Sequence, residues 1–234
     1  MRDLSDAFGK ALALLVELDP DLVEIIALSL RVTTTALLIA SLLAMPFGAA
    51  VAVFRFRGRA LLVVVLNALM GLPPVVVGLV VYLLLSRSGP LGFLGWLFTP
   101  AAMIVAQTLL IAPIVAALTR QVVADLWEEY EEQLRSLGAS RLRVLPTLLV
   151  DGRSRLLTVM LAGFGRAIAE VGAVLIVGGN IAHVSRVMTT AITLETSKGD
   201  LALALALGFV LLLLSLLVNG ASLAAERLIS GWRV

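Results

Sequence analysis

Five long apolar stretches constrain this chain more than any other feature of its sequence. They cover roughly residues 25–54, 60–85, 101–123, 156–177 and 201–225. A helix needs about 20 apolar residues to cross the hydrocarbon core of a bilayer, and each stretch is long enough. A backbone inside lipid must satisfy its own hydrogen bonds, which favours helices for such lengths. We therefore predict an all-α integral membrane protein with five transmembrane helices per chain.

The composition supports a lipid environment and excludes several kinds of site. Hydrophobic residues make up 60% of the 234 residues, and the mean hydropathy is +1.06. The net charge of only +2 argues against a nucleic-acid partner. The absence of cysteine excludes disulfides and thiolate chemistry. His183 is the single histidine, so we expect no metal site and interpret it as a surface or interface residue.

The distribution of lysine and arginine predicts the orientation of the chain. Eleven of these residues fall on one side of the predicted spans and five on the other, with Arg31 and Arg166 inside spans. The richer side is cytoplasmic by the positive-inside rule. The N-terminus is then outside and the C-terminus cytoplasmic. Residues 1–20 lack a signal-peptide pattern and are expected to form a surface helix of one permease domain, 1–234.

Residues 125–155 form a charged island among the apolar stretches. Leu126, Tyr130, Leu134 and Leu137 share one helical face, and Glu128 and its acidic neighbours point elsewhere. Gly138 suits a left-handed C-terminal cap, and Ser140 can cap the next helix. We expect Pro146 to redirect the chain after a second short helix. The island is then either a solvated cytoplasmic connector or an element that couples the spans to a soluble partner.

The fourth apolar stretch carries two charges. Arg166 and Glu170 are four residues apart, so they share a helical face and can form an ion pair. Charges in lipid are costly and face the protein interior or a water-filled path. One alternative is an internal ion pair, and the other is an Arg166 that attracts a passing dianion. The glycines around Gly172 mark either a subunit interface or path wall, or ordinary helix packing within one chain.

Two segments of this sequence resemble ABC transporter permeases. Glu132 followed by Gly138-Ala139-Ser140-Arg141 is similar to the "EAA" loop of that family, although Gln133 and Leu134 replace its two alanines and Val150-Asp151 replaces its Leu-Pro. The segment 163–173 resembles oxyanion permeases. Residues 177–196 resemble permeases of the tungstate-uptake type most closely.

The resemblance implies the transmembrane domain of a type I ABC importer, with a cytoplasmic coupling helix, in a bacterial or archaeal inner membrane. It implies that the loop docks on an ATP-binding subunit, present in two copies, and that a solute-binding protein meets residues 180–200 outside. It implies tungstate as substrate, with molybdate as the alternative. The expected coupling residues are Glu128, Glu132, Leu134, Leu137, Gly138, Ala139, Ser140 and Arg141. Arg166, Glu170, Gly172 and Asn180 are expected at the path or a helix interface, and Ser185, Thr189, Thr190 and Thr193 at the binding protein.

The sequence disfavours other functions. No nucleotide-binding loop is present, so any ATP would be used by a separate polypeptide and this chain would bind no cofactor. Five spans per chain favour a path between two copies of the chain. An intramembrane hydrolase lacks its nucleophile motif, and a secondary transporter would show internal repeats. A membrane scaffold stays possible and would not stimulate an ATPase.

Overall fold

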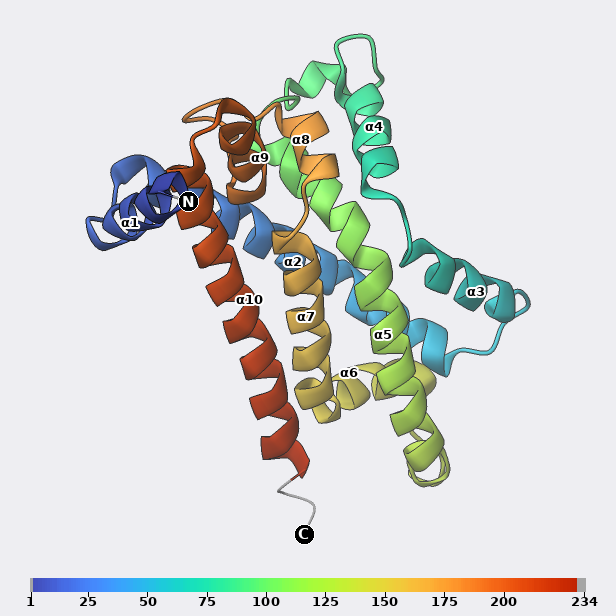
Figure 1. Cartoon of the computed structure of the whole chain (residues 1–234). Coiled ribbons are helices and arrows are strands. Elements are labelled where there is room, and N and C mark those ends of the chain that lie inside the picture. The colour runs from blue at the N-terminus through green and yellow to red at the C-terminus, as the bar shows by residue number, and fades with distance from the viewer. Residues whose placement is uncertain (1, 231–234) are drawn as a thin grey trace. The chain divides into compact units, whose positions relative to one another are not determined.

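The computed structural model describes the backbone of residues 2–230 and the side chains of Ala7 and of residues 9–218, 220 and 221. The described residues are helical and contain no strand. The helices are α1 (Arg2–Val16), α2 (Pro20–Val53), α3 (Arg59–Leu69), α4 (Pro74–Leu85), η1 (Gly92–Leu94), α5 (Pro100–Ser136), α6 (Arg141–Asp151), α7 (Arg153–Ile168), α8 (Gly172–Gly178), α9 (Met188–Lys198) and α10 (Leu201–Ser230) (Figure 1).

The chain divides into two compact units, and the long helices contribute to both. Unit 1 consists of Met1–Ala36, Pro73–Gln107 and Gly165–Leu217. Unit 2 consists of Leu37–Leu72, Thr108–Phe164 and Val218–Val234.

The helices account for the predicted spans. Three of them, α2, α5 and α10, are each long and apolar enough to cross a membrane. The pairs α3–α4 and α7–α8 pass the same test together, with bends of 99° and 59° at their breaks, so the described chain has up to five spans. The prediction of an all-helical membrane protein is confirmed, but the second and fourth spans are each broken into two helices.

Proline produces one of these breaks and leaves two helices intact. Pro73 has an extended backbone, and Pro74 occupies the first turn of α4, where its missing N–H costs nothing. Pro46 and Pro113, in contrast, lie inside the continuous helices α2 and α5. A single proline removes one hydrogen bond from a helix of more than thirty residues, and the rest of the ladder holds.

In unit 1, α4 packs closely against α8. The two lie side by side in Figure 1, with α8 in orange and α4 in green. A Cβ atom on Gly78 would lie only 2.8 Å from the Cα of Ala173, so the two backbones approach as closely as glycine allows. This contact holds the second halves of both broken spans together.

In unit 2, α6 lies across α5 and leads into the start of α7 (Figure 1). Its buried residues Val144 and Leu148 join a core with α5 and the end of α2. The buried residues of this core are Ala49, Ala52, Val53, Val123, Leu126, Trp127, Val144 and Leu148. Arg59 closes the end of α2 by donating to the carbonyls of Val51 and Ala52 at 2.8 and 3.1 Å.

Candidate functional site

The turn between α5 and α6 is formed by Gly138, as its sequence position predicts. Its φ is +72°, in the left-handed region that favours glycine. The Ala139 N–H donates to the Leu134 carbonyl and the Gly138 N–H to the Arg135 carbonyl, both at 3.0 Å. These two bonds form a Schellman cap, which ends a helix sharply. The acidic helix of the charged island is therefore the end of α5 itself and not a separate element.

The predicted apolar face of the island is only partly buried. Leu126 is buried, and Tyr130 and Leu134 pack against the unit 2 core. Leu137, in contrast, is 81% exposed, because α5 has ended and the turn carries this residue away from the core. Trp127, which the spacing argument missed, is buried in the same core.

The tip of this turn presents both charged and apolar side chains. Two large apolar residues flank Gly138: Leu137 and, on α6, Leu142, which is 70% exposed. The other expected coupling residues that are exposed at the tip or along the last turns of α5 are Glu128, Glu132, Ser140 and Arg141. Ala139 and Leu134 are partly buried and support the turn from below.

Two expectations about the basic half of the island need correction. Ser140 is the residue before α6 and is extended, but its side chain makes no capping hydrogen bond. Pro146 does not redirect the chain, because it lies inside α6, which continues to Asp151. The change of direction comes at Gly152, whose N–H donates to the Leu148 carbonyl at 2.8 Å.

Ion pairs tie the ends of the unit 2 helices together. Arg55, just after α2, lies 3.8 Å from Glu131 on α5, and Arg135 lies 3.5 Å from the same carboxylate. Arg155 on α7 lies 3.8 Å from Asp125 on α5. These long, exposed pairs contribute little to stability, about 0–1 kcal/mol each.

In unit 1, Arg166 and Glu170 form the ion pair that their spacing allows, with Nη1 and Oε2 2.7 Å apart. The pair lies at the break between α7 and α8. The Glu170 side chain is 4% exposed, whereas that of Arg166 is 38% exposed. The second carboxylate oxygen of Glu170 accepts from the Ala173 N–H at 3.1 Å and so caps α8. The pair therefore hides the anionic partner and leaves the cationic partner accessible.

Two residues distant in sequence donate hydrogen bonds to backbone carbonyls at the break, and no pattern in the sequence predicts either role. Gln107 on α5 donates through Nε2 to the Ala167 carbonyl at 3.1 Å. Thr189 on α9 donates to the Glu170 carbonyl at 2.8 Å. Carbonyls freed by a broken helix in a membrane need such donors. Only the folded chain brings these partners together.

Gly172 and Asn180 make contacts within unit 1. A Cβ on Gly172 would lie 3.0 Å from the Val75 side chain, so this glycine belongs to the α4–α8 interface. Asn180 has a φ of +51°, and its amide donates to the Thr190 carbonyl at 3.2 Å. The Gly172 contact is packing between two helices of one chain, and the Asn180 bond ties the turn after α8 to α9.

Three of the four residues expected to meet a binding protein are buried. Ser185 is fully buried and hydrogen-bonded to the Gly178 carbonyl, and Thr190 bonds the backbone of Val187. Thr189 is buried on Glu170, as described above. These hydroxyls satisfy backbone groups inside unit 1 and do not reach the surface. Only Thr193 is exposed, and its hydroxyl donates to the Thr189 carbonyl at 3.0 Å.

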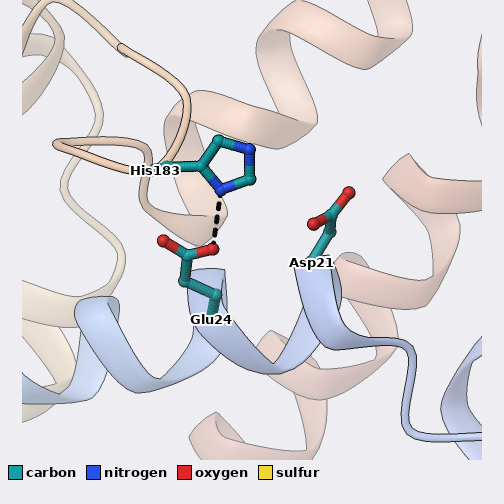
Figure 2. A group of neighbouring side chains, drawn as sticks. All are labelled: Asp21, Glu24 and His183. Atoms are coloured by element: carbon teal, nitrogen blue, oxygen red, sulfur yellow. Dashed lines mark hydrogen bonds and ion pairs between the residues drawn. The ribbon is translucent and has the colours of Figure 1, made fainter.

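His183 is exposed and bridges the loop before α9 to the start of α2. Its Nδ1 lies 2.8 Å from the Glu24 carboxylate, and Asp21 is adjacent (Figure 2). The ligand-type atoms of these three residues lie within 4.8 Å of one another. The Glu24 hydrogen bond and charge raise the pKa of His183, Asp21 adds to this, and desolvation and Arg186 oppose it. The cluster is exposed, and the positive charge of Arg186 lies close enough to act on His183. We therefore do not assign a metal to it.

The family of the chain follows from comparison with known proteins. Residues 44–231 match the model of the "binding-protein-dependent transport system inner membrane component" family. The tungstate uptake system permease protein of Peptoclostridium acidaminophilum is 43% identical over 94% of this chain and 96% of its own length. The corresponding protein of Campylobacter jejuni is 36% identical over 92% of this chain and 90% of its own length. A probable anion ABC transporter permease of Haloferax volcanii is 42% identical over 85% of this chain and 88% of its own length. The chain therefore belongs to the inner-membrane permease family of binding-protein-dependent ABC transport systems.

Proposed function

We propose that this chain is the permease subunit of a tungstate importer, in which two copies of the chain enclose one path. The observation that carries this proposal is the 43% identity, over nearly the whole chain, to a tungstate uptake permease. A separate ATP-binding subunit, in two copies, hydrolyses ATP, and a solute-binding protein delivers the oxyanion from outside. The N-terminus is outside the cell and the C-terminus is cytoplasmic, as the distribution of arginines predicts.

The ATP-binding subunit docks on the turn between α5 and α6 in this proposal. Leu137 and Leu142 are large apolar residues that are exposed at the tip of a rigid cap, and solvent-exposed apolar side chains of this kind mark interaction sites. Glu132 and Arg141 are exposed beside them, and their charges would orient the ATP-binding subunit as it docks. These residues together form the coupling surface.

Motion at the coupling surface reaches the spans through unit 2. α6 packs into one core with α5 and the end of α2, so the turn moves with them as one body. α7 begins directly after the Gly152 turn that ends α6. ATP-driven closure of the partner would thus move the start of α7. Each ligand shifts the transporter only by its different affinity for the inward and outward states.

Arg166 is the residue of this chain that we assign to the passing oxyanion. Its guanidinium is partly exposed, while the Glu170 carboxylate that neutralises it is buried. A tetrahedral dianion is attracted to the exposed cation, and the paired carboxylate keeps that attraction weak. A transport path needs such weak binding because the substrate has to leave. The α8 N-terminus is occupied by Glu170 and adds no second anion site.

The test is ATPase activity of the chain assembled with its ATP-binding subunit in lipid nanodiscs. Binding protein loaded with tungstate should stimulate hydrolysis more than the empty protein does, and more than protein offered molybdate or sulfate. Preferential stimulation by molybdate would reassign the substrate within the oxyanions. A stable complex whose hydrolysis ignores every loaded binding protein would indicate the scaffold alternative.

A further inference from the structure

Unit 2 contains an apolar groove that the proposed transport mechanism does not use. The groove measures about 590 Å³ and lies between the second half of α2 and the start of α7. Its walls are formed by leucine, methionine, valine and proline side chains, with one serine and one arginine. Leu42 is 76% exposed in one wall, and Val150 and Leu157 are exposed in the other. The open groove therefore presents continuous apolar surface.

The length of the groove matches one leaflet of a bilayer. The α2 wall runs from Leu38 to Pro46, which is about 12 Å at 1.5 Å per residue. Half of the hydrocarbon core of a bilayer is about 15 Å thick. An acyl chain lying along this wall would stay within its own leaflet.

One cationic side chain lines the groove. Arg153 is the first residue of α7, and its Nη1 donates to the Val150 carbonyl at 3.1 Å. That single bond orients the guanidinium and leaves several of its five donors available. Guanidinium groups bind phosphate in a bidentate manner. Apolar walls of about one leaflet's length, together with an oriented arginine in the lining, complement a phospholipid.

The wall composition favours a lipid over a second copy of this chain. Helices that associate in membranes place small residues at their contact so that the backbones can approach. This groove is instead lined mainly by leucine and methionine side chains, such as Leu38, Met45 and Met160, and has no glycine or alanine in its lining. Such walls suit a flexible acyl chain better than another helix.

We propose that this groove binds one anionic phospholipid, with its acyl chain between α2 and α7 and its phosphate on Arg153. The inference rests on the chain's being a membrane protein and does not depend on the transported oxyanion. Anionic headgroups are favoured because cationic side chains at the membrane surface select for them. The last residues of α6, Leu149 and Val150, line the groove, so the bound lipid touches the helix that carries the coupling surface.

The test is native mass spectrometry of the complete transporter, purified in detergent and titrated with phosphatidylglycerol or phosphatidylcholine. The unmodified protein should retain phosphatidylglycerol preferentially. Arg153→Gln should weaken that retention about tenfold while leaving phosphatidylcholine retention unchanged. Arg57→Gln is the matched control, because Arg57 is an exposed arginine near the end of α2 that does not line the groove, and it should leave both unchanged.

A second variant fills the groove itself. The natural chain has no cysteine, so Leu157→Cys gives one reactive thiol in the wall. Coupling that thiol to a bulky maleimide after folding should reduce retention of both lipids. Phosphatidylglycerol retention that survives both Arg153→Gln and the blocked thiol would overturn the proposal. Disulfide cross-linking of Leu157→Cys between two copies would also overturn it and would make the groove a subunit interface.

Discussion

Gly138 decides the direction of the chain where α5 passes into α6, because only its backbone angle allows the Schellman cap. A Cβ atom at this position would meet nothing within 4 Å, so space does not exclude a side chain. The constraint is the φ of +72°, which a β-branched residue adopts only at a cost. Substitutions at Gly138 therefore test the turn without disturbing packing.

We predict that Gly138→Val uncouples the transporter while membrane insertion stays normal. The left-handed conformation should cost roughly 1–2 kcal/mol, which is enough to reshape the turn. Binding-protein-stimulated ATPase activity measures the effect. Gly138→Asn is the matched control, because asparagine tolerates this conformation, and it should keep most of the stimulation. Full stimulation in the valine variant would remove the turn from the coupling pathway.

His183, the single histidine of the chain, makes the loop before α9 sensitive to pH. Its pKa is raised, chiefly by Glu24 and further by Asp21, so the protonated form is favoured in the folded protein. A raised pKa adds stability that is fully present below the ordinary value of about 6.5. That contribution is lost as the pH rises through the folded-state value.

We predict that NMR titration of His183 in nanodiscs gives a pKa above its ordinary value. Glu24→Gln should bring the value down, since it replaces the charged acceptor of the hydrogen bond with a neutral amide. Asp21→Asn removes only a charge and should lower it less. An unchanged titration in the Glu24 variant would show that the bridge in Figure 2 does not form in lipid.

The helices could be predicted from the sequence where length and hydropathy define them. They were less predictable where their bounds depend on tertiary contacts. The five apolar stretches correspond to α2, α3–α4, α5, α7–α8 and α10 because span length depends on the bilayer alone. The acidic helix of the charged island was interpreted as a separate element because charge begins near Asp125, whereas it is the end of α5, which continues to the glycine turn. A change of polarity along a helix does not end it.

The candidate site was predictable only in its local parts. The Gly138 cap and the Arg166–Glu170 pair depend on neighbours in sequence, and both are present. The burial of Thr189 and Gln107 at the α7–α8 break depends on segments far apart in the chain. Serine and threonine in a connecting segment were therefore interpreted as surface residues, although they satisfy freed backbone groups inside unit 1.

The break between α7 and α8 offers a test of what Arg166 does. We predict that Glu170→Ala destabilises the protein by about 1.5–3 kcal/mol, because a charged group and the Ala173 N–H lose their acceptor. Arg166→Met combined with Glu170→Gln should recover much of that loss, since no unpaired charge is left. Thermal unfolding in detergent measures both variants.

Tungstate uptake by the double variant then separates the two roles of Arg166. If the pair only locks the break, the stable double variant should transport normally. In our proposal Arg166 attracts the oxyanion, so uptake should fall severalfold even though the fold is retained. Normal uptake would assign the pair to structure alone.

At the scale of the whole molecule, transport requires a surface on which another polypeptide can act. In our proposal the described part of unit 2 offers this surface at the turn between α5 and α6, where apolar and charged residues stand on a turn held by the core beneath it. Apolar anchors contribute most of the free energy of an interface, and rim charges mainly set its specificity and rate. The two kinds of residue should therefore respond differently to substitution.

We predict that Leu137→Ala together with Leu142→Ala lowers copurification of the ATP-binding subunit about tenfold or more, because each exposed leucine loses its buried contact with the partner. Glu132→Lys should weaken copurification less, and its effect should shrink as salt is raised. Leu212→Ala with Leu216→Ala is the matched control, because these leucines are equally exposed but lie on the spanning helix α10. Equal yields from all variants would place the partner elsewhere, and loss in the α10 control as well would indicate a general defect in assembly.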